Sequence, residues 1–279
     1  MKIAYFPGCS AHAMASEYDR SARLVCDDLG VALNEVTDWN CCGATAAHSL
    51  DHELMLGLNG RNLATVSRMG FDKVTTPCSG CFSQLKRTGF ELKSSETARR
   101  DIPRVMHLLQ FLAEEVGLDR ILGSVVKRVR GLKLAAYYGC LITRPKKITE
   151  FDDPEQPMSM DRILRAIGAQ TVNWSHKAEC CGGGFAVSQT SIVIDLAGQV
   201  LEAARQAGAE AVIVACPLCQ SNLDARQKCI EEERGIVYAL PVIYFTQLIA
   251  LAFGHPAGKA GLKNLLVSPF PLLERIGLL

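Results

Sequence analysis

LGLNGRNLATVSRMGFDKVTTPCSGC, residues 56–81, decides the fold, because it reads as a helix and a short apolar strand that ends in a C-x-x-C pair. IDLAGQVLEAARQAGAEAVIVACPLC, residues 194–219, aligns with this stretch without a gap and ends in the same pair. The alignment places Gly70 against Gly208 and Val74 against Val212. The chain therefore contains two copies of one unit.

The cysteines follow the same duplication. Each copy has a single cysteine, then an adjacent pair followed by glycine, then C-x-x-C. The two series are Cys9, Cys41, Cys42, Cys78 and Cys81, and Cys140, Cys180, Cys181, Cys216 and Cys219. Cys26 and Cys229 fall outside both series, and we interpret them as small buried or partly buried hydrophobes on helices.

Strands and helices alternate within each copy. KIAYFPGC (2–9) matches KLAAYYGC (133–140), and both read as short apolar strands that end at Gly-Cys. Residues 72–76 and 211–215 are strands that run directly into C-x-x-C. This alternation predicts an α/β fold with a small Rossmann-like parallel sheet in each half. The series cysteines then follow strands at their carboxyl ends, where open α/β sheets bind ligands.

The duplication predicts two pseudo-symmetric domains, residues 1–131 and 132–279. The first includes a helical linker over about 86–131, because residues 104–117 have apolar side chains three and four apart. The second carries a C-terminal helical extension. Its last segment, residues 269–279, is predicted to be a packed helix, with a docking element as the alternative.

Composition limits the class of protein. The chain has 279 residues, 48% of them hydrophobic and 21% charged, which is typical of a soluble globular protein. A net charge of +1 argues against nucleic-acid binding. The apolar residues 240–254 are too few to span a bilayer, and they predict a buried helix that ends at Gly254. We expect a cytoplasmic protein without membrane insertion, in which twelve cysteines indicate metal or redox chemistry rather than disulfides.

The adjacent cysteines narrow the chemistry. C-x-x-C alone suits either a thiol–disulfide redox pair or half of a zinc site. Neighbouring side chains of an extended backbone point to opposite faces, so two adjacent thiolates fit a broad cluster better than one small ion. Five cysteines per half exceed the four that a zinc ion or a cubane cluster takes. Iron–sulfur chemistry is favoured, while zinc binding and thiol–disulfide exchange stay open.

Taken together, these motifs resemble the tandem cysteine-rich CCG domains of the B-subunit family of heterodisulfide reductase, including the related subunit of the sulfur-oxidising heterodisulfide reductase-like complex. The resemblance includes YFPGC, DWNCCGA, GCLITRP…FDDPEQP and the C-terminal LPVIYFTQLIALAFG. It implies two four-iron ([4Fe-4S]) clusters of noncubane type. The resemblance assigns Cys9, Cys41, Cys42, Cys78 and Cys81 to the first cluster, and Cys140, Cys180, Cys181, Cys216 and Cys219 to the second.

The family resemblance also implies an activity. The chain would be the iron–sulfur catalytic subunit of an oxidoreductase complex, in which a disulfide bound between two clusters accepts one electron from each. Its reaction would be heterodisulfide reduction, or thiol or persulfide oxidation in sulfur metabolism. The alternative is a pure electron-transfer subunit of another CCG-domain complex of the lactate or glycolate type.

Partner subunits follow from the same resemblance. The chain lacks the C-x2-C-x2-C-x3-C run of ferredoxins. Electrons would therefore arrive through two partners of the heterodisulfide reductase kind, a ferredoxin-like iron–sulfur subunit of the C type and a flavin-containing subunit of the A type.

Proton donors are less well defined by the sequence. His12 lies close to Cys9, and His48 and His52 lie four residues apart on one face of a predicted helix. His12 and His48 are the candidate catalytic residues, since histidine exchanges protons near neutral pH. A solvated helix face is the alternative interpretation of the pair.

Other side chains near the motifs have ordinary interpretations as well. Arg144, Lys146 and Lys147 follow Cys140 and either attract an anionic substrate or are common loop charges. Trp39 and Trp174 precede the two cysteine pairs and are interpreted as packing residues.

Overall fold

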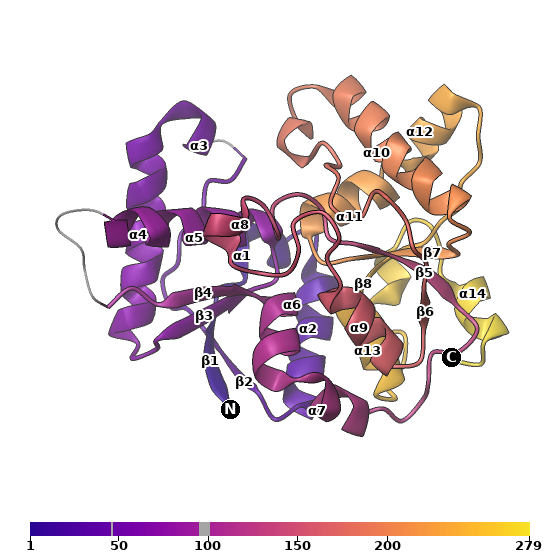
Figure 1. The fold of residues 1–279 in the computed structure, drawn as a ribbon, viewed down its shortest axis with the longest axis horizontal. Helices are drawn as coiled ribbons and strands as arrows, with labels where there is room; N and C mark the ends of the chain where they lie inside the picture. Colours follow the sequence, from indigo (N-terminus) through magenta and orange to yellow (C-terminus); the bar gives the residue numbers. More distant parts are fainter. Residues whose placement is uncertain (46, 95–100) are drawn as a thin grey trace.

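The structure is a computed structural model that describes residues 1–45, 47–94 and 101–279. Two halves lie side by side, and each is built around its own four-stranded sheet (Figure 1). Every strand pair in both sheets is parallel. The predicted fold class, two α/β units with parallel sheets, is confirmed.

The first sheet has the order β2-β1-β3-β4. Its strands are β1 (Lys2–Tyr5), β2 (Ala32–Glu35), β3 (Lys73–Thr76) and β4 (Arg104–His107). The helices of this half are α1 (Gly8–Ala11), α2 (Ser16–Asp28), α3 (Ala47–Leu50), α4 (His52–Arg68), α5 (Ser79–Ser94), α6 (Leu108–Phe111) and α7 (Leu118–Gly123), with a π-helical turn at Leu112–Val116.

The second sheet repeats this order as β6-β5-β7-β8. Its strands are β5 (Lys133–Tyr137), β6 (Gln170–Thr171), β7 (Ala211–Val214) and β8 (Val242–Tyr244). The helices are α8 (Lys146–Thr149), α9 (Ser159–Ala166), α10 (Thr190–Gln206), α11 (Pro217–Asp224), α12 (Gln227–Arg234), α13 (Phe245–Ala252) and α14 (Phe270–Arg275), with 3₁₀ turns at Gly183–Phe185 and Leu262–Asn264.

The strand order creates a switch point in each sheet. From β1 the chain places β2 on one side and β3 on the other, so the winding direction reverses between β1 and β3. Open sheets bind ligands outside the carboxyl ends of the strands at such a point. Cys9 follows β1 and Cys78 follows β3, while Cys140 and Cys216 follow the equivalent strands β5 and β7.

Two segments predicted to be wholly helical begin as strands, and this part of the prediction was wrong. Residues 104–117 open with β4, which pairs with β3. Residues 240–254 open with β8, which pairs with β7, and only then form α13, followed by Gly254 at φ 93°. Short apolar runs fit a buried strand as well as a buried helix, so periodicity alone does not separate them.

Helices α2 and α13 join the two halves (Figure 1). Ser21 Oγ and Thr246 Oγ1 lie 2.7 Å apart in a buried hydrogen bond. The rings of Tyr18 and Tyr244 stack with their centroids 4.1 Å apart, and the Tyr18 hydroxyl donates to the Ala215 carbonyl. Buried apolar side chains from both halves form one continuous core.

The remaining expectations about the fold have mixed outcomes. Leu273 of α14 is fully buried, so the C-terminal segment contains a packed helix as predicted. Cys26 is buried as predicted, but Cys229 on α12 is exposed, because it lies on the solvent side of that helix. Among the described residues, no helix combines the length and the apolar character needed to cross a membrane. The boundary between residues 131 and 132 stays a prediction.

Candidate metal centre

The first cysteine series gathers at the carboxyl edge of the first sheet. Cys9 lies in α1, Cys41 and Cys42 lie in the loop after β2, and Cys78 and Cys81 bracket the start of α5. The Sγ atoms of Cys9 and Cys41 are 3.8 Å apart, and those of Cys42 and Cys81 are 3.2 Å apart. The fold thus gathers thiols that lie far apart in the sequence.

The second series gathers in the same way at the second sheet. The Sγ atoms of Cys181 and Cys219 are 3.5 Å apart. The thiols of Cys140 and Cys180 are hydrogen-bonded to each other, and so are those of Cys216 and Cys219. This set is more enclosed than the first, because Cys140 and Cys180 are partly buried whereas Cys9 and Cys41 are exposed.

The two sets touch where the halves meet. Cys78 of the first half and Cys216 of the second share a hydrogen bond between their thiols. These two cysteines are equivalent in the sequence repeat. The duplication therefore brings both sets together across the interface between the halves.

The glycine after each cysteine pair positions the first sulfur of the pair. Gly43 (φ 71°) and Gly182 (φ 76°) adopt the left-handed conformation that glycine accepts most readily. The Gly43 amide donates to Cys41 Sγ at 3.4 Å, and the Gly182 amide donates to Cys180 Sγ at 3.3 Å. The turn thus points a backbone N–H group at a sulfur in both halves.

These contacts separate the acidities of the thiols. Hydrogen bonds from Cys42 and Cys9, with a contribution from the Gly43 amide, lower the pKa of Cys41 to about 2. The hydrogen bond from Cys140, together with backbone amides, lowers the pKa of Cys180 to about 6. The bond to Cys41 raises the pKa of Cys42 to about 12. Each half therefore holds a thiolate, the form of cysteine that binds metals.

A second glycine in each half lets the single cysteine approach the C-x-x-C pair. Gly8 has φ 73°, and a Cβ atom there would lie 2.7 Å from Cys81 Sγ. Gly139 has φ 69°, and a Cβ atom there would lie 3.0 Å from Cys219 Sγ. Any other residue at these positions would displace a sulfur.

Two buried asparagines, which sequence reasoning missed, fix the cysteine pairs from behind. Asn59 on α4 donates to the Cys42 carbonyl at 3.0 Å. Asn222 on α11 donates to the Cys181 carbonyl at 2.9 Å. The asparagines come from different helices and do not align in the repeat, so comparison of the two copies gives no signal for them.

A buried ion pair supports the second set alone. Lys177 Nζ and Asp161 Oδ1 are 2.9 Å apart, and the two side chains are 2% and 0% exposed. The Tyr138 hydroxyl donates to Asp161 Oδ2, and the Lys177 carbonyl accepts from the amides of Tyr138 and Gly139. The network therefore fixes the segment that leads into Cys140.

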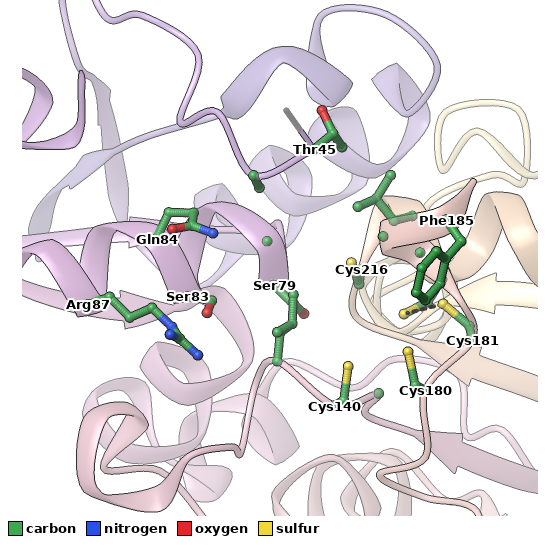
Figure 2. Close-up of a pocket in the computed structure, with 18 of the residues that line it drawn as sticks. Thr45, Ser79, Ser83, Gln84, Arg87, Cys140, Cys180, Cys181, Phe185 and Cys216 are labelled. Carbon is green, nitrogen blue, oxygen red and sulfur yellow. Dashed lines mark hydrogen bonds between the residues drawn. The ribbon is translucent and has the colours of Figure 1, made fainter. Parts of the chain in front are cut away.

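A cavity of about 360 Å³ lies beside the second set, between the halves (Figure 2). One wall carries the five thiols of the second half. The opposite wall is one face of α5, with Ser79, Ser83, Gln84 and Arg87. Apolar lining comes from Met55, Leu141, Phe185 and Leu218. Thiols and a polar helix face thus look onto one space of small-molecule size.

The candidate histidines have different positions. His52 lines the cavity, and its Nε2 lies 2.9 Å from Glu91 Oε2. His12 is not among the described lining residues; its Nε2 is 3.3 Å from Glu35 Oε1. The side chain of His48 lies outside the described part of the chain. The expectation of one helix face for His48 and His52 was wrong, because Asp51 caps a new helix, α4, between them.

The other candidate side chains lie apart from the described cavity lining. Arg144 pairs with Glu155 at 2.8 Å, and Lys147 lies over the ring of Phe90. Trp174 is 6% exposed and donates to the Ala136 carbonyl, as expected of a packing residue. Trp39 packs against Phe6 in the first half.

The donor sets fit an iron–sulfur cluster better than a single ion. In the described part of the chain, no three His, Cys, Asp or Glu side chains are placed to hold one metal ion. Each half instead offers five cysteines in touching pairs, a backbone amide aimed at sulfur, and glycines where a side chain would collide with a thiol. Thiolates with amide donors are the usual surroundings of such clusters.

Comparison with known proteins agrees with this arrangement. The profile of the cysteine-rich CCG domain family matches residues 3–86 and 134–224, which hold the two cysteine series. The chain belongs to this CCG-domain family. The sequence-based expectation of a resemblance to the B subunit of heterodisulfide reductase, with its oxidoreductase and iron–sulfur character, is confirmed at the level of the family.

Individual relatives cover nearly the whole chain. It is 32% identical to the 8-methylmenaquinol:fumarate reductase membrane anchor subunit of Wolinella succinogenes, over 94% of this chain and 96% of that one. It is 27% identical to the B subunit of the ferredoxin/F420H2-dependent CoB-CoM heterodisulfide reductase of Methanosarcina acetivorans, over 99% and 97%. A crystal structure of a hypothetical protein from Helicobacter pylori shares the fold, with a TM-score of 0.72 at 14% identity over 96% of this chain and 52% of that chain.

Proposed function

We propose that this protein is the iron–sulfur catalytic subunit of a heterodisulfide reductase-type complex that acts on a disulfide or thiol substrate. The observation that carries the proposal is the cavity between the halves, which is lined by all five thiols of the second series. The two ligand sets would be Cys9, Cys41, Cys42, Cys78 and Cys81, and Cys140, Cys180, Cys181, Cys216 and Cys219. Noncubane four-iron clusters would use the fifth cysteine of each set.

The chain's own residues have definable tasks in this reaction. The bound clusters would supply electrons one at a time, and a disulfide takes up two in becoming two thiols. Met55, Leu141, Phe185 and Leu218 line the cavity and exclude water from it. His52 sits on the cavity wall with its Nε2 bonded to Glu91, so it can hold a proton for a departing thiolate.

The complex would supply what this chain lacks. We infer a ferredoxin-like subunit of the C type and a flavin-containing subunit of the A type as partners, since the relative from Methanosarcina acetivorans is named as one subunit of a ferredoxin-dependent reductase. The direction, heterodisulfide reduction or thiol and persulfide oxidation, is set by these partners. A cytoplasmic location stays a prediction, and the name of the Wolinella succinogenes relative, a membrane anchor subunit, points the other way.

A second function is favoured by that same relative. Its 32% identity supports a chain that only passes electrons within a quinol-linked fumarate reductase complex. In this case the cavity would take no disulfide.

Single-turnover chemistry separates the two functions. The anaerobically purified, cluster-loaded chain would be reduced chemically and mixed with small organic disulfides, and released thiol would be counted. Thiol release at about two per disulfide consumed is expected for the catalytic function. Cluster reoxidation by a quinone without any thiol release from disulfides would favour the electron-transfer function and contradict the first proposal.

A further inference from the structure

One face of α5 forms a polar stripe opposite the thiols of the second series. Ser79, Ser83, Arg87 and Glu91 follow one another at intervals of four residues, which places them on one side of the helix, and all of them line the cavity. Gln84 lies beside them. Figure 2 shows Ser79, Ser83, Gln84 and Arg87 on one side of the space, with Cys140, Cys180 and Cys216 on the other.

Three atoms of this stripe lack partners. Arg87 Nε, Gln84 Oε1 and Ser79 Oγ are buried without a hydrogen bond among the described residues. Gln84 and Ser79 are 6% and 2% exposed. Buried polar groups are normally paired, so several unpaired groups around one cavity indicate a ligand that is polar where it meets α5.

The charge in the stripe is available to that ligand. Arg87 forms no ion pair within the described chain, whereas Glu91, one turn further along, bonds His52 at 2.9 Å. An arginine fork suits the planar oxygens of a carboxylate, and it also suits the oxygens of a sulfonate or phosphate. The free guanidinium therefore favours an anionic group.

The sequence repeat shows that the fold does not require this stripe. When the alignment is continued past C-x-x-C, Arg87 falls opposite Ala225 and Gln84 falls opposite Asn222. Asn222 serves the Cys181 carbonyl, but in the first half Asn59 has taken over that task for Cys42. Gln84 is thus released from the structural role of its counterpart and faces the cavity.

We infer that Arg87, with Gln84, Ser83 and Ser79, is the subsite that recognises a negatively charged group of the substrate. The substrate class is a small organic disulfide or thiol that carries a carboxylate, sulfonate or phosphate. Binding of this group to α5 directs the sulfur atoms of the substrate toward the opposite, thiol-lined wall. The inference rests on the proposed function and names the substrate class of that same cavity.

Matched disulfides test the subsite. Dithiodipropionate carries a carboxylate at each end, and hydroxyethyl disulfide is uncharged. Binding of both to the oxidised, cluster-loaded chain is measured by calorimetry, and kcat and KM are measured separately after chemical reduction. Wild-type protein is expected to bind the anion more tightly, and Arg87→Gln is expected to weaken that binding roughly 10- to 100-fold, mainly in KM, with little effect on the neutral disulfide.

Two further variants control for charge and folding. Arg205→Gln removes the same charge from an exposed position on α10 that is paired with Glu202, and it should leave both affinities unchanged. Arg87→Lys keeps the cation without the fork and should retain part of the preference for the anion. Iron content and circular dichroism identify any variant that fails to fold.

Charge reversal gives the sharpest result. Arg87→Glu should lose dithiodipropionate binding and gain affinity for cystamine, whose two ends are cations. Equal loss for charged and neutral disulfides in Arg87→Gln, or no shift toward cystamine in Arg87→Glu, would overturn the subsite and leave the proposed function standing. Absence of binding and turnover with all three disulfides in wild-type protein would overturn the proposed function together with the subsite.

Discussion

At the scale of single residues, glycines set the geometry of both cysteine sets. Gly43 and Gly182 adopt positive φ and direct their amides at the first sulfur of each adjacent pair. Gly8 and Gly139 allow a thiol to approach the backbone more closely than a Cβ atom would permit. The adjacent cysteines work as a motif because the glycine that follows them turns the chain.

Gly182→Ala tests the role of this turn. The left-handed conformation costs an alanine roughly 1–2 kcal/mol, and the new Cβ would lie 3.0 Å from Val193 Cα. We expect the variant to lose the metal of the second set and retain that of the first, so iron and acid-labile sulfide fall to about half of the wild-type values.

A second glycine provides the matched control. Gly208 also has positive φ, 74°, but no heavy atom lies within 4 Å of a Cβ built there. Gly208→Ala should therefore keep its full iron content despite similar backbone strain. Equal iron loss in both variants would show that strain, and not the turn at the cysteine pair, is responsible.

Asn222→Leu tests the support behind the second cysteine pair. The substitution leaves the buried Cys181 carbonyl without its donor, which should lower the free energy of unfolding by about 1–3 kcal/mol. Urea denaturation measures the change. Asn34→Ala is the control, because the Asn34 amide bonds only the exposed carbonyl of Ala32. A loss no larger in Asn222→Leu than in Asn34→Ala would refute the assignment.

At the scale of helices and strands, the buried pair of Lys177 and Asp161 fixes the segment between β5 and the second cysteine pair. Removal of one partner of a buried ion pair leaves an uncompensated charge. Lys177→Met should therefore lower the free energy of unfolding by about 3–5 kcal/mol, as measured by urea denaturation.

The matched variants for this pair are straightforward. Lys73→Met breaks a partly exposed pair with Glu115 and should cost much less. The double replacement Lys177→Met with Asp161→Leu should recover part of the loss, because both charges are then gone. A double variant less stable than Lys177→Met alone would show that the side chains act separately.

Much of the element order could be predicted from the sequence, and the exceptions have one physical cause. Strands such as β3 and β7 end in C-x-x-C and carry a clear signal in both copies. By contrast, β4 and β8 run directly into helices with no turn residue between them, so their apolar residues merge with the helical pattern. Separation of such strands depends on their neighbours in the sheet, which lie far away in sequence.

The candidate site shows the same limit. All ten series cysteines gather in two sets as the spacing predicted, while their role as cluster ligands stays a prediction. The polar stripe of α5 was not predicted, because serine, glutamine and arginine at helical spacing resemble an ordinary solvated face. Only the fold places Arg87 opposite thiols that come from the other half.

At the scale of the whole molecule, the two halves share one core. Tyr18 stacks on Tyr244 and Ser21 bonds Thr246 across the interface between α2 and α13. Cys78 and Cys216 meet at the same interface. The duplication has therefore produced one cooperative body with two cysteine sets in contact.

This unity predicts a single unfolding transition. The chain has two tryptophans, Trp39 in the first half and Trp174 in the second, so Trp174→Phe and Trp39→Phe each leave a probe of one half. Fluorescence of the two variants should give coincident urea midpoints after correction for any shared stability change. Two separate midpoints within one variant, seen by fluorescence and by circular dichroism, would contradict a shared core.

The central claim, that two five-cysteine sets hold two iron–sulfur clusters, is tested most directly by metal analysis. Iron, acid-labile sulfide and zinc would be measured per chain after strictly anaerobic purification. Two four-iron clusters predict about eight irons with matching sulfide and no stoichiometric zinc. About four irons, or stoichiometric zinc without sulfide, would contradict the account.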